Sequence, residues 1–223
     1  MSGTTLPLLL RDPAVVYQQW PQFSEFCASA LVYQSLYRVR YDEVRIPPDI
    51  QANLTDYRAT LSIVVLLTED DPDSVAVVPA VARLLALSPQ LDLRILRDDE
   101  DPELLQHMLQ VLLPPAELER LEESDLPQFF LFDEDWVLRG QWGPRPMSCE
   151  RRLLEWLRRH PQYEALENDD SPGGQSRWLE LMHTLTFEMR AWYNTEFNQD
   201  CVREWWALLS ALQNEDESDE SEK

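Results

Sequence analysis

Residues 61–96 read as a strand, a helix and a second strand, and this order restricts the chain to few folds. Residues 61–67 form a nearly continuous apolar run rich in β-branched side chains, which is typical of a central strand buried on both faces. Residues 74–87 carry apolar side chains at helical spacing, and residues 91–96 alternate. A crossover of this length predicts parallel strands joined by a right-handed connection.

The following segment predicts a helix, an antiparallel hairpin and a closing helix. Pro102 suits the first turn of a helix, because proline lacks the N–H that this position leaves unpaired. The predicted strands are residues 128–132 and 136–142, with an acidic turn between them, and the closing helix is 149–160. The summed order, βαβα–ββα, predicts an α/β fold with a mixed central sheet flanked by helices.

Helical additions are expected at both ends of this unit. Residues 12–46 carry an apolar stripe at helical spacing, which includes Phe23, Phe26, Cys27, Ala30 and Leu31, and Pro47-Pro48 ends this element.

Beyond a polar linker at residues 168–174, helices are expected over 178–192 and 200–212, the second capped by Asp200. An acidic, apolar-free tail is expected to be disordered. The predicted domains are 1–52 (N-terminal helical extension), 53–165 (α/β domain), 166–213 (C-terminal helical extension) and 214–223 (tail).

The formal charge of −22 is read first as a source of solubility, and it also makes some classes of partner poorer candidates than others. A strongly acidic chain repels phosphate backbones and anionic membranes, so nucleic acid and membrane are poor candidates, and basic proteins or peptides are better ones. No segment approaches the length of a membrane helix, and residues 1–10 make a poor signal peptide. Three widely spaced cysteines form neither a disulfide framework nor a metal site, which favours a cytoplasmic protein.

The middle of the chain resembles the thioredoxin superfamily. Pro79 matches the proline that kinks the helix after the redox motif, and Pro127, opening a strand, matches the cis-proline. Trp142-Gly143 matches the glycine that ends the hairpin. The resemblance implies a thioredoxin-like fold and places Asp71 and Ser74 where the two redox cysteines would stand.

A narrower resemblance is to a bacterial thioredoxin-like family with helical N- and C-terminal extensions. It is carried by Thr68-Glu69-Asp70, by Trp142-Gly143-Pro144-Arg145-Pro146 and by Arg190-Ala191-Trp192-Tyr193-Asn194. The chain departs from this family in lacking the Cys-x-x-Cys motif and in carrying an acidic insertion at about residues 114–125.

Asp71 and Ser74 cannot exchange disulfides, because that chemistry needs an attacking thiolate and a second, resolving thiol. Acidic residues at a helix start do accept its free N–H groups, so capping is the favoured role of this loop and ligand binding the lesser one. The acidic runs at Glu69–Asp73 and Asp98–Asp101 lack the ligand pattern of a calcium loop, so neither a metal nor another cofactor is expected.

The resemblance also implies a peptide-binding groove. Carried over by position, it uses Asp70, Asp71, Pro72, Leu126, Pro127, Trp142 and Gly143. An extended peptide would pair with the backbone at Leu126, and the acidic rim would prefer a basic one. The alternative is that Pro127 only shapes the fold.

These observations favour a redox-inactive binding or scaffold protein, with enzymatic activity not expected. One competing hypothesis is a thiol–disulfide oxidoreductase or single-cysteine redox protein that uses Cys149, alone or with Cys27 or Cys201. Another is docking of a partner or a second copy, as a homodimer, through aromatic-rich terminal helices around Trp205 and Trp206. Exposure of these tryptophans would favour docking, and burial would make them core.

Overall fold

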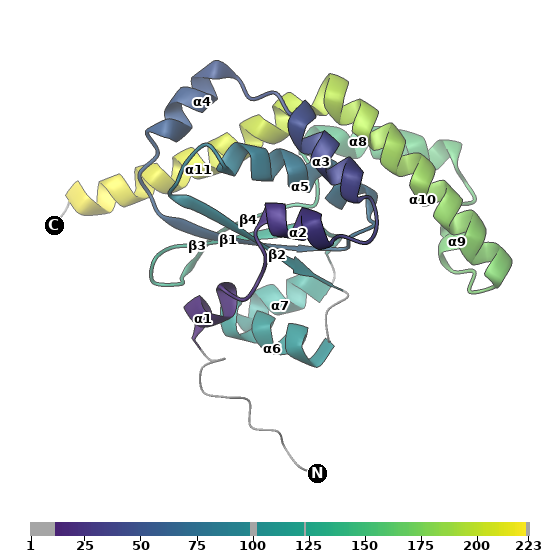
Figure 1. The fold of residues 1–223 in the computed structure, drawn as a ribbon, viewed down its shortest axis with the longest axis horizontal. Coiled ribbons are helices and arrows are strands. Elements are labelled where there is room, and N and C mark those ends of the chain that lie inside the picture. Colours follow the sequence, from purple (N-terminus) through teal and green to yellow (C-terminus); the bar gives the residue numbers. More distant parts are fainter. Residues whose placement is uncertain (1–11, 99–101, 123, 222–223) are drawn as a thin grey trace, which may run out of the picture.

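The structure, a computed structural model, describes residues 12–98, 102–122 and 124–221. A four-stranded sheet in the order β2-β1-β3-β4 lies at its centre (Figure 1). β1 and β2 are parallel, whereas β3 runs antiparallel to both β1 and β4. The strands are β1 (Leu61–Leu67), β2 (Leu91–Arg97), β3 (Gln128–Phe132) and β4 (Leu138–Trp142). The predicted mixed sheet, its parallel crossover and its hairpin are therefore confirmed.

Helices cover both faces of the sheet, because the inner strands are buried on both sides (Figure 1). In β1, Ile63 and Val65 belong to the core of the upper layer in Figure 1, whereas Val64 and Leu66 belong to the core of the lower layer. α5 (Pro72–Leu85) is the centre of the upper layer and is buried over nearly its whole length. α3, α10 and α11 pack against it.

The segment 12–46 is three helices rather than one element. They are α1 (Pro13–Tyr17), α2 (Phe23–Ser29) and α3 (Gln34–Glu43). Pro48 does not only end this region, since it is the first residue of α4 (Pro48–Thr55), where its missing N–H costs nothing. Phe26, Cys27 and Ala30 are buried as expected, but Leu31 lies in the connection after α2 and is 85% exposed.

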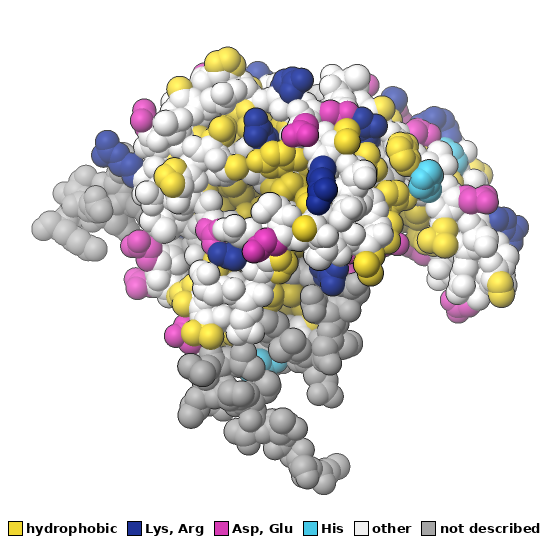
Figure 2. All heavy atoms as spheres, in the orientation of Figure 1, with side chains coloured by type: hydrophobic (Ala, Val, Ile, Leu, Met, Phe, Trp, Pro, Cys, Tyr) yellow, Lys and Arg dark blue, Asp and Glu magenta, His cyan; other side chains and the backbone are white. Residues whose placement is uncertain are grey.

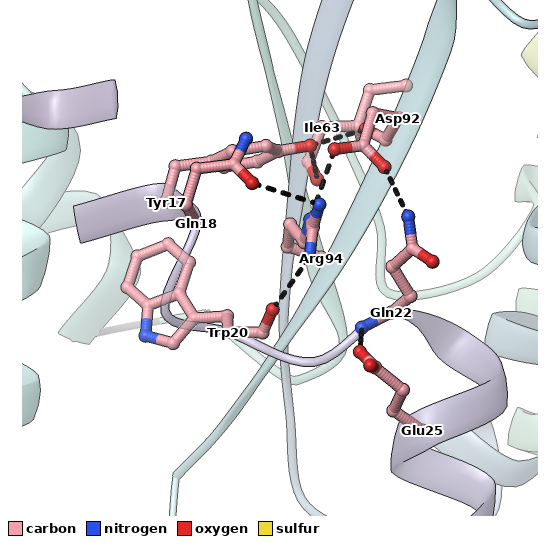
Figure 3. A network of polar contacts seen from close by, with 8 residues as sticks. All are labelled: Tyr17, Gln18, Trp20, Gln22, Glu25, Ile63, Asp92 and Arg94. Carbon is pink, nitrogen blue, oxygen red and sulfur yellow. Dashed lines mark hydrogen bonds and ion pairs between the residues drawn. The ribbon is translucent and has the colours of Figure 1, made fainter. Parts of the chain in front are cut away.

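The segment after α1 closes part of the outer edge of β2 (Figure 3). The Arg94 guanidinium donates to the Trp20 carbonyl (3.1 Å) and forms an ion pair with Asp92 (3.0 Å). Gln22 donates to the same aspartate, and the Tyr17 hydroxyl donates to the Asp92 carbonyl at 2.7 Å. These bonds protect an edge strand that would otherwise present unpaired backbone groups.

The C-terminal helices form one nearly continuous rod. α10 (Pro172–Trp192) passes through a π-helical turn, η2 (Tyr193–Phe197), directly into α11 (Asn198–Ser221). The expected linker therefore ends at Ser171, which caps α10, and Asp200 lies inside the first turn of α11 instead of capping it. α11 also extends to Ser221, where a disordered tail was expected.

The Arg190–Asn194 sequence ties this rod to α3. Arg190 and Asn194 both donate to the Glu43 carboxylate. The fully buried Arg40 donates to the Asn194 side chain (3.0 Å) and to the Ala76 carbonyl in α5 (3.1 Å). The C-terminal helices are thus part of the same core as the sheet.

The remaining helices complete the two layers. The acidic insertion is not a loop, because α7 (Pro115–Glu122) occupies most of it and packs with α6 (Pro102–Leu112) below the sheet (Figure 1). α8 (Met147–Arg159) and the short α9 (Tyr163–Glu167) follow the hairpin and lie beside α10. Residues 99–101 of the second acidic run lie outside the described residues.

Candidate functional site

The start of α5 stands where the resemblance places the redox pair. Asp71 directly precedes the helix, and its carboxylate accepts the N–H of Ser74 at 2.6 Å. The predicted capping role of Asp71 is confirmed. Pro72 is the first residue of the helix, a position that suits proline. Ser74 is fully buried, so its hydroxyl cannot reach a substrate.

Arg145 neutralises this helix start from the other side. Its guanidinium donates from Nε and Nη2 to the carboxylate of Asp73, at 2.8 and 2.7 Å. It also forms ion pairs with Glu150 of α8 (2.9 Å) and with Asp125, which precedes the Leu126–Pro127 bond (3.4 Å). One cation therefore links α5, α8 and the predicted groove, and it is only 12% exposed.

Burial dominates the titration of this cluster. It raises the pKa of Asp73, although the nearby Arg145 acts in the opposite direction. Burial, together with the charge of Asp73, raises the pKa of Asp71 and outweighs the hydrogen bond from Ser74. Burial alone would lower the pKa of Arg145, but Asp73 and Glu150 more than offset this and raise it. The guanidinium stays charged, whereas the buried carboxylates of Asp71 and Asp73 are costly to ionise.

The loop before β3 and the end of β4 come together beside this cluster. The Leu126–Pro127 and Gly143–Pro144 peptide bonds are both cis. Gly143 has a φ of +139°, and a Cβ on it would lie 2.2 Å from the Pro127 carbonyl oxygen, so only glycine fits there. A cavity of about 370 Å³ opens at this place, lined by Ser124, Asp125, Gln128, Gln141, Trp142, Gly143 and Pro144.

The seven predicted groove residues differ in their exposure. Asp70 is exposed, Asp71, Leu126, Trp142 and Gly143 are half-buried, and Pro72 and Pro127 are buried. Trp142 faces the core more than the groove. Its ring contacts those of Phe129 and Trp205, and its indole N–H donates to Glu204 at 3.1 Å.

Two further parts of the chain border the acidic loop, and the sequence alone did not indicate them. Glu69 accepts the N–H of Val32, which holds the segment after α2, with its exposed Leu31 and Val32 side chains, against the acidic loop. Burial raises the pKa of Tyr163 in α9 to about 12, and the negative charges of Glu167, Asp125 and Asp71 act in the same direction. Tyr163 therefore lies within range of the acidic cluster. Apolar and aromatic groups thus lie around an acidic centre.

The cysteines are not placed for exchange chemistry. All three are free and buried. Cys149 lies in the first turn of α8, but it is 0% exposed, and burial with the charge of Asp73 raises its pKa to about 12. Among the residues that the structure describes, no group of three or more His, Cys, Asp or Glu could hold a metal ion. Trp205 is buried, and Trp206 packs half-buried against the core.

Arg145 is the functional residue that sequence reasoning missed. The Trp-Gly-Pro-Arg-Pro run supported the family resemblance, but it did not indicate which residue pairs with Arg145. The sequence held no signal for this pair, because Asp73 is one of several carboxylates in the run Glu69–Asp73 and nothing there marks it as buried. Buried charges require a partner, and the structure shows that Arg145 is the partner of Asp73.

A family model described as thioredoxin matches residues 20–158. The chain belongs to this thioredoxin family. The match includes the acidic helix start, the Leu126–Pro127 loop and Arg145, so these features belong to the family domain. A search of curated proteins finds no match. Within the described residues, no helix combines the length and apolar content needed to cross a membrane.

Two solved structures are similar to this thioredoxin-family chain. A protein of unknown function from Pseudomonas aeruginosa is 15% identical, with a TM-score of 0.48, and the match covers 80% of this chain and 94% of that one. An HIV epitope-scaffold is 13% identical with the same TM-score, and the match covers 89% and 97% of the two chains.

Proposed function

We propose that this thioredoxin-family protein binds a basic, extended peptide segment of a partner and does not exchange thiols. The observation that carries the proposal is the cluster around Arg145. By the resemblance, Asp71 and Ser74 stand at the positions of the family's thiols. Arg145 connects the neighbouring Asp73 to Asp125, which precedes the Leu126–Pro127 bond, so a charged cluster lies beside the groove.

The backbone at Leu126 supports peptide binding. Its N–H and C=O make no hydrogen bond to any described residue, and the loop lies beside the cavity at Trp142 and Gly143. An extended peptide would satisfy both groups by adding a short strand. Strand addition is tolerant of sequence, so the side chains around it must supply the selectivity.

The surrounding charges favour a basic peptide. Asp70 is exposed and forms no ion pair within the described part of the chain, and Asp125 is exposed beside the loop. The apolar side chains of Leu31 and Val32 offer contacts for the remainder of the segment. Complementary charge contributes chiefly to the selection of the partner and to the association rate, whereas apolar contact contributes to the lifetime of the complex.

A displayed random-peptide library tests this function. Selected on the full chain, it should be enriched in Lys and Arg next to β-branched or aromatic residues. Asp70→Lys should weaken a selected peptide about fivefold or more, because like charges then meet. Asp56→Lys, an equal charge change at the exposed residue that follows α4, is the matched control and should not weaken it.

Hydrogen exchange locates the bound peptide. Amide exchange at residues 124–128 should slow when a selected peptide is added, since strand addition protects the Leu126 N–H. Selection of peptides without basic residues, or equal weakening by Asp70→Lys and Asp56→Lys, would contradict a specific acidic groove.

A further inference from the structure

A larger pocket lies away from the groove, on the other half of α5. Its volume is about 640 Å³, within the usual range for small-molecule sites. It is bounded by α2, α3, the end of α5 and the start of β2. Since α5 rises about 1.5 Å per residue, its two ends are roughly 20 Å apart. This pocket and the peptide groove are therefore separate sites.

The pocket has an apolar floor and a polar mouth. Figure 2 shows it as a hollow near the centre of the upper layer, with hydrophobic side chains inside and both basic and acidic side chains around it. The floor is made by Cys27, Ala82, Leu85, Leu91 and Leu93, all of them buried. This composition would hold a hydrocarbon chain or ring, with its polar end held at the mouth.

Aromatic rings form one wall of the mouth. Phe23 and Tyr41 are stacked with centroids 5.2 Å apart, and the Arg83 guanidinium lies 5.1 Å from the centroid of the Tyr41 ring. The stacking fixes two flat apolar surfaces beside the opening, and the Arg83 guanidinium lies against the Tyr41 ring. A ligand entering here would meet preformed surfaces, which lowers the entropic cost of binding.

The mouth of the pocket holds one guanidinium, from Arg38, and two carboxylates, from Asp42 and Asp92. Arg38 donates one N–H to the Cys27 carbonyl (3.1 Å) and has no ion pair with any residue that the structure describes, so it is the group there that can receive an anion. The Asp92 carboxylate is already taken by Arg94 and Gln22. Asp42, one turn from Arg38, is the remaining carboxylate in the lining.

We infer that this pocket binds an amphiphilic carboxylic acid, with its apolar part on the floor and its carboxylate on Arg38. A guanidinium holds a carboxylate through two parallel N–H···O bonds, and four of its five N–H donors are not used by the Cys27 carbonyl. The inference is independent of the peptide groove, because no residue is common to the two sites.

Parinaric acid, a fluorescent polyene fatty acid, is the probe, and its methyl ester is the uncharged comparison. Binding to the full chain should raise the fluorescence, and the acid should bind at least about tenfold more tightly than the ester. Arg38→Gln should weaken the acid about tenfold and leave the ester unchanged. Arg203→Gln, at an exposed position in α11, is the matched control and should change neither.

Filling the pocket tests the location. Ala86 lines the pocket but is exposed, so Ala86→Phe should block it without disturbing the core. Ala207→Phe, an identical change on the surface of α11, should bind like wild type. Equal affinity for acid and ester, full binding by Ala86→Phe, or loss on Asp42→Asn with no effect of Arg38→Gln would overturn the inference. So would absence of binding by both probes.

Discussion

The two ends of α5 differ in how their charged residues are partnered. At its start, carboxylates from three segments surround one arginine, and each buried charge has a partner. Near its end, an open apolar pocket is lined by an arginine that has no ion pair with any described residue. The comparison teaches that charges at the start of the helix are balanced within the protein, whereas the pocket at its other end leaves a cation for a ligand.

Replacing Arg145, the cation at the centre of the carboxylate cluster, should lower the stability of the protein most. Arg145→Met keeps most of the side-chain volume but leaves Asp73 buried and unpaired, which should lower the free energy of unfolding by about 3–5 kcal/mol. The loss should shrink in acid, because a protonated Asp73 no longer needs the cation. Urea unfolding monitored by tryptophan fluorescence at several pH values measures both.

A surface arginine provides the control for this change. Arg152 forms a longer ion pair with Glu155 (3.9 Å), and both side chains are more than a third exposed. Arg152→Met should therefore cost less than about 1 kcal/mol at any pH. Equal losses for the two variants would mean that the Arg145 cluster is no more than a surface network.

Asp71→Asn should remove part of the pH dependence of stability. The pKa of Asp71 is raised by folding, so the folded state holds a proton that the unfolded state releases near pH ~3.9. Stability therefore falls as the pH rises from there towards the raised pKa, by up to about 1.4 kcal/mol per pH unit. Unfolding free energies between pH 4 and 8 should be flatter in the asparagine variant. Identical slopes would show that Asp71 titrates normally.

The hydrogen bond by which Asp71 caps α5 should contribute less to the free energy of unfolding than the Arg145 cluster does. Asn accepts the Ser74 N–H as well as Asp does, whereas Asp71→Ala removes the acceptor and should cost about 1 kcal/mol relative to Asp71→Asn. Thermal unfolding at a fixed low pH, where Asp71 is neutral, isolates this difference. A matching stability of the two variants would mean that the bond seen at 2.6 Å adds nothing.

The smallest effect on stability is expected at Leu31. This side chain is 85% exposed, so Leu31→Ser should change the unfolding free energy by no more than about 0.5 kcal/mol. It should nevertheless weaken a library-selected peptide, since Leu31 belongs to the segment that Glu69 holds against the acidic loop. Isothermal titration of that peptide decides. Unchanged affinity would remove the loop after α2 from the proposed partner surface.

Local patterns in the sequence were sufficient for the sheet and for the helices α5, α6 and α8 beside it, but not for the four helices of residues 13–55 or for α7. The runs at residues 61–67 and 128–132 are buried on both faces, and such strands reveal themselves by composition alone. The continuous C-terminal rod was harder to predict, although no proline or glycine interrupts residues 175–221. Its acidic end lacks an apolar stripe, so periodicity did not distinguish a helix from a tail.

The candidate site was predictable only in part, for a physical reason. Capping by Asp71 depends on neighbours within three residues and could be read from the sequence. The Asp73–Arg145 pair joins residues 72 positions apart, and the pocket near Arg38 needs four separate elements. Charge pairing and cavities arise from packing, which a single sequence does not encode locally.

Thiol labelling of the native, reduced protein tests the central claim most directly, with mass mapping at several pH values and insulin disulfide reduction measured on the same sample. We predict that Cys149 and Cys201 stay unlabelled through neutral pH and that insulin is not reduced, because both thiols are buried with raised pKa values. Labelling of Cys149 near neutral pH together with turnover would contradict the account, and the site would then be a relocated thiol centre.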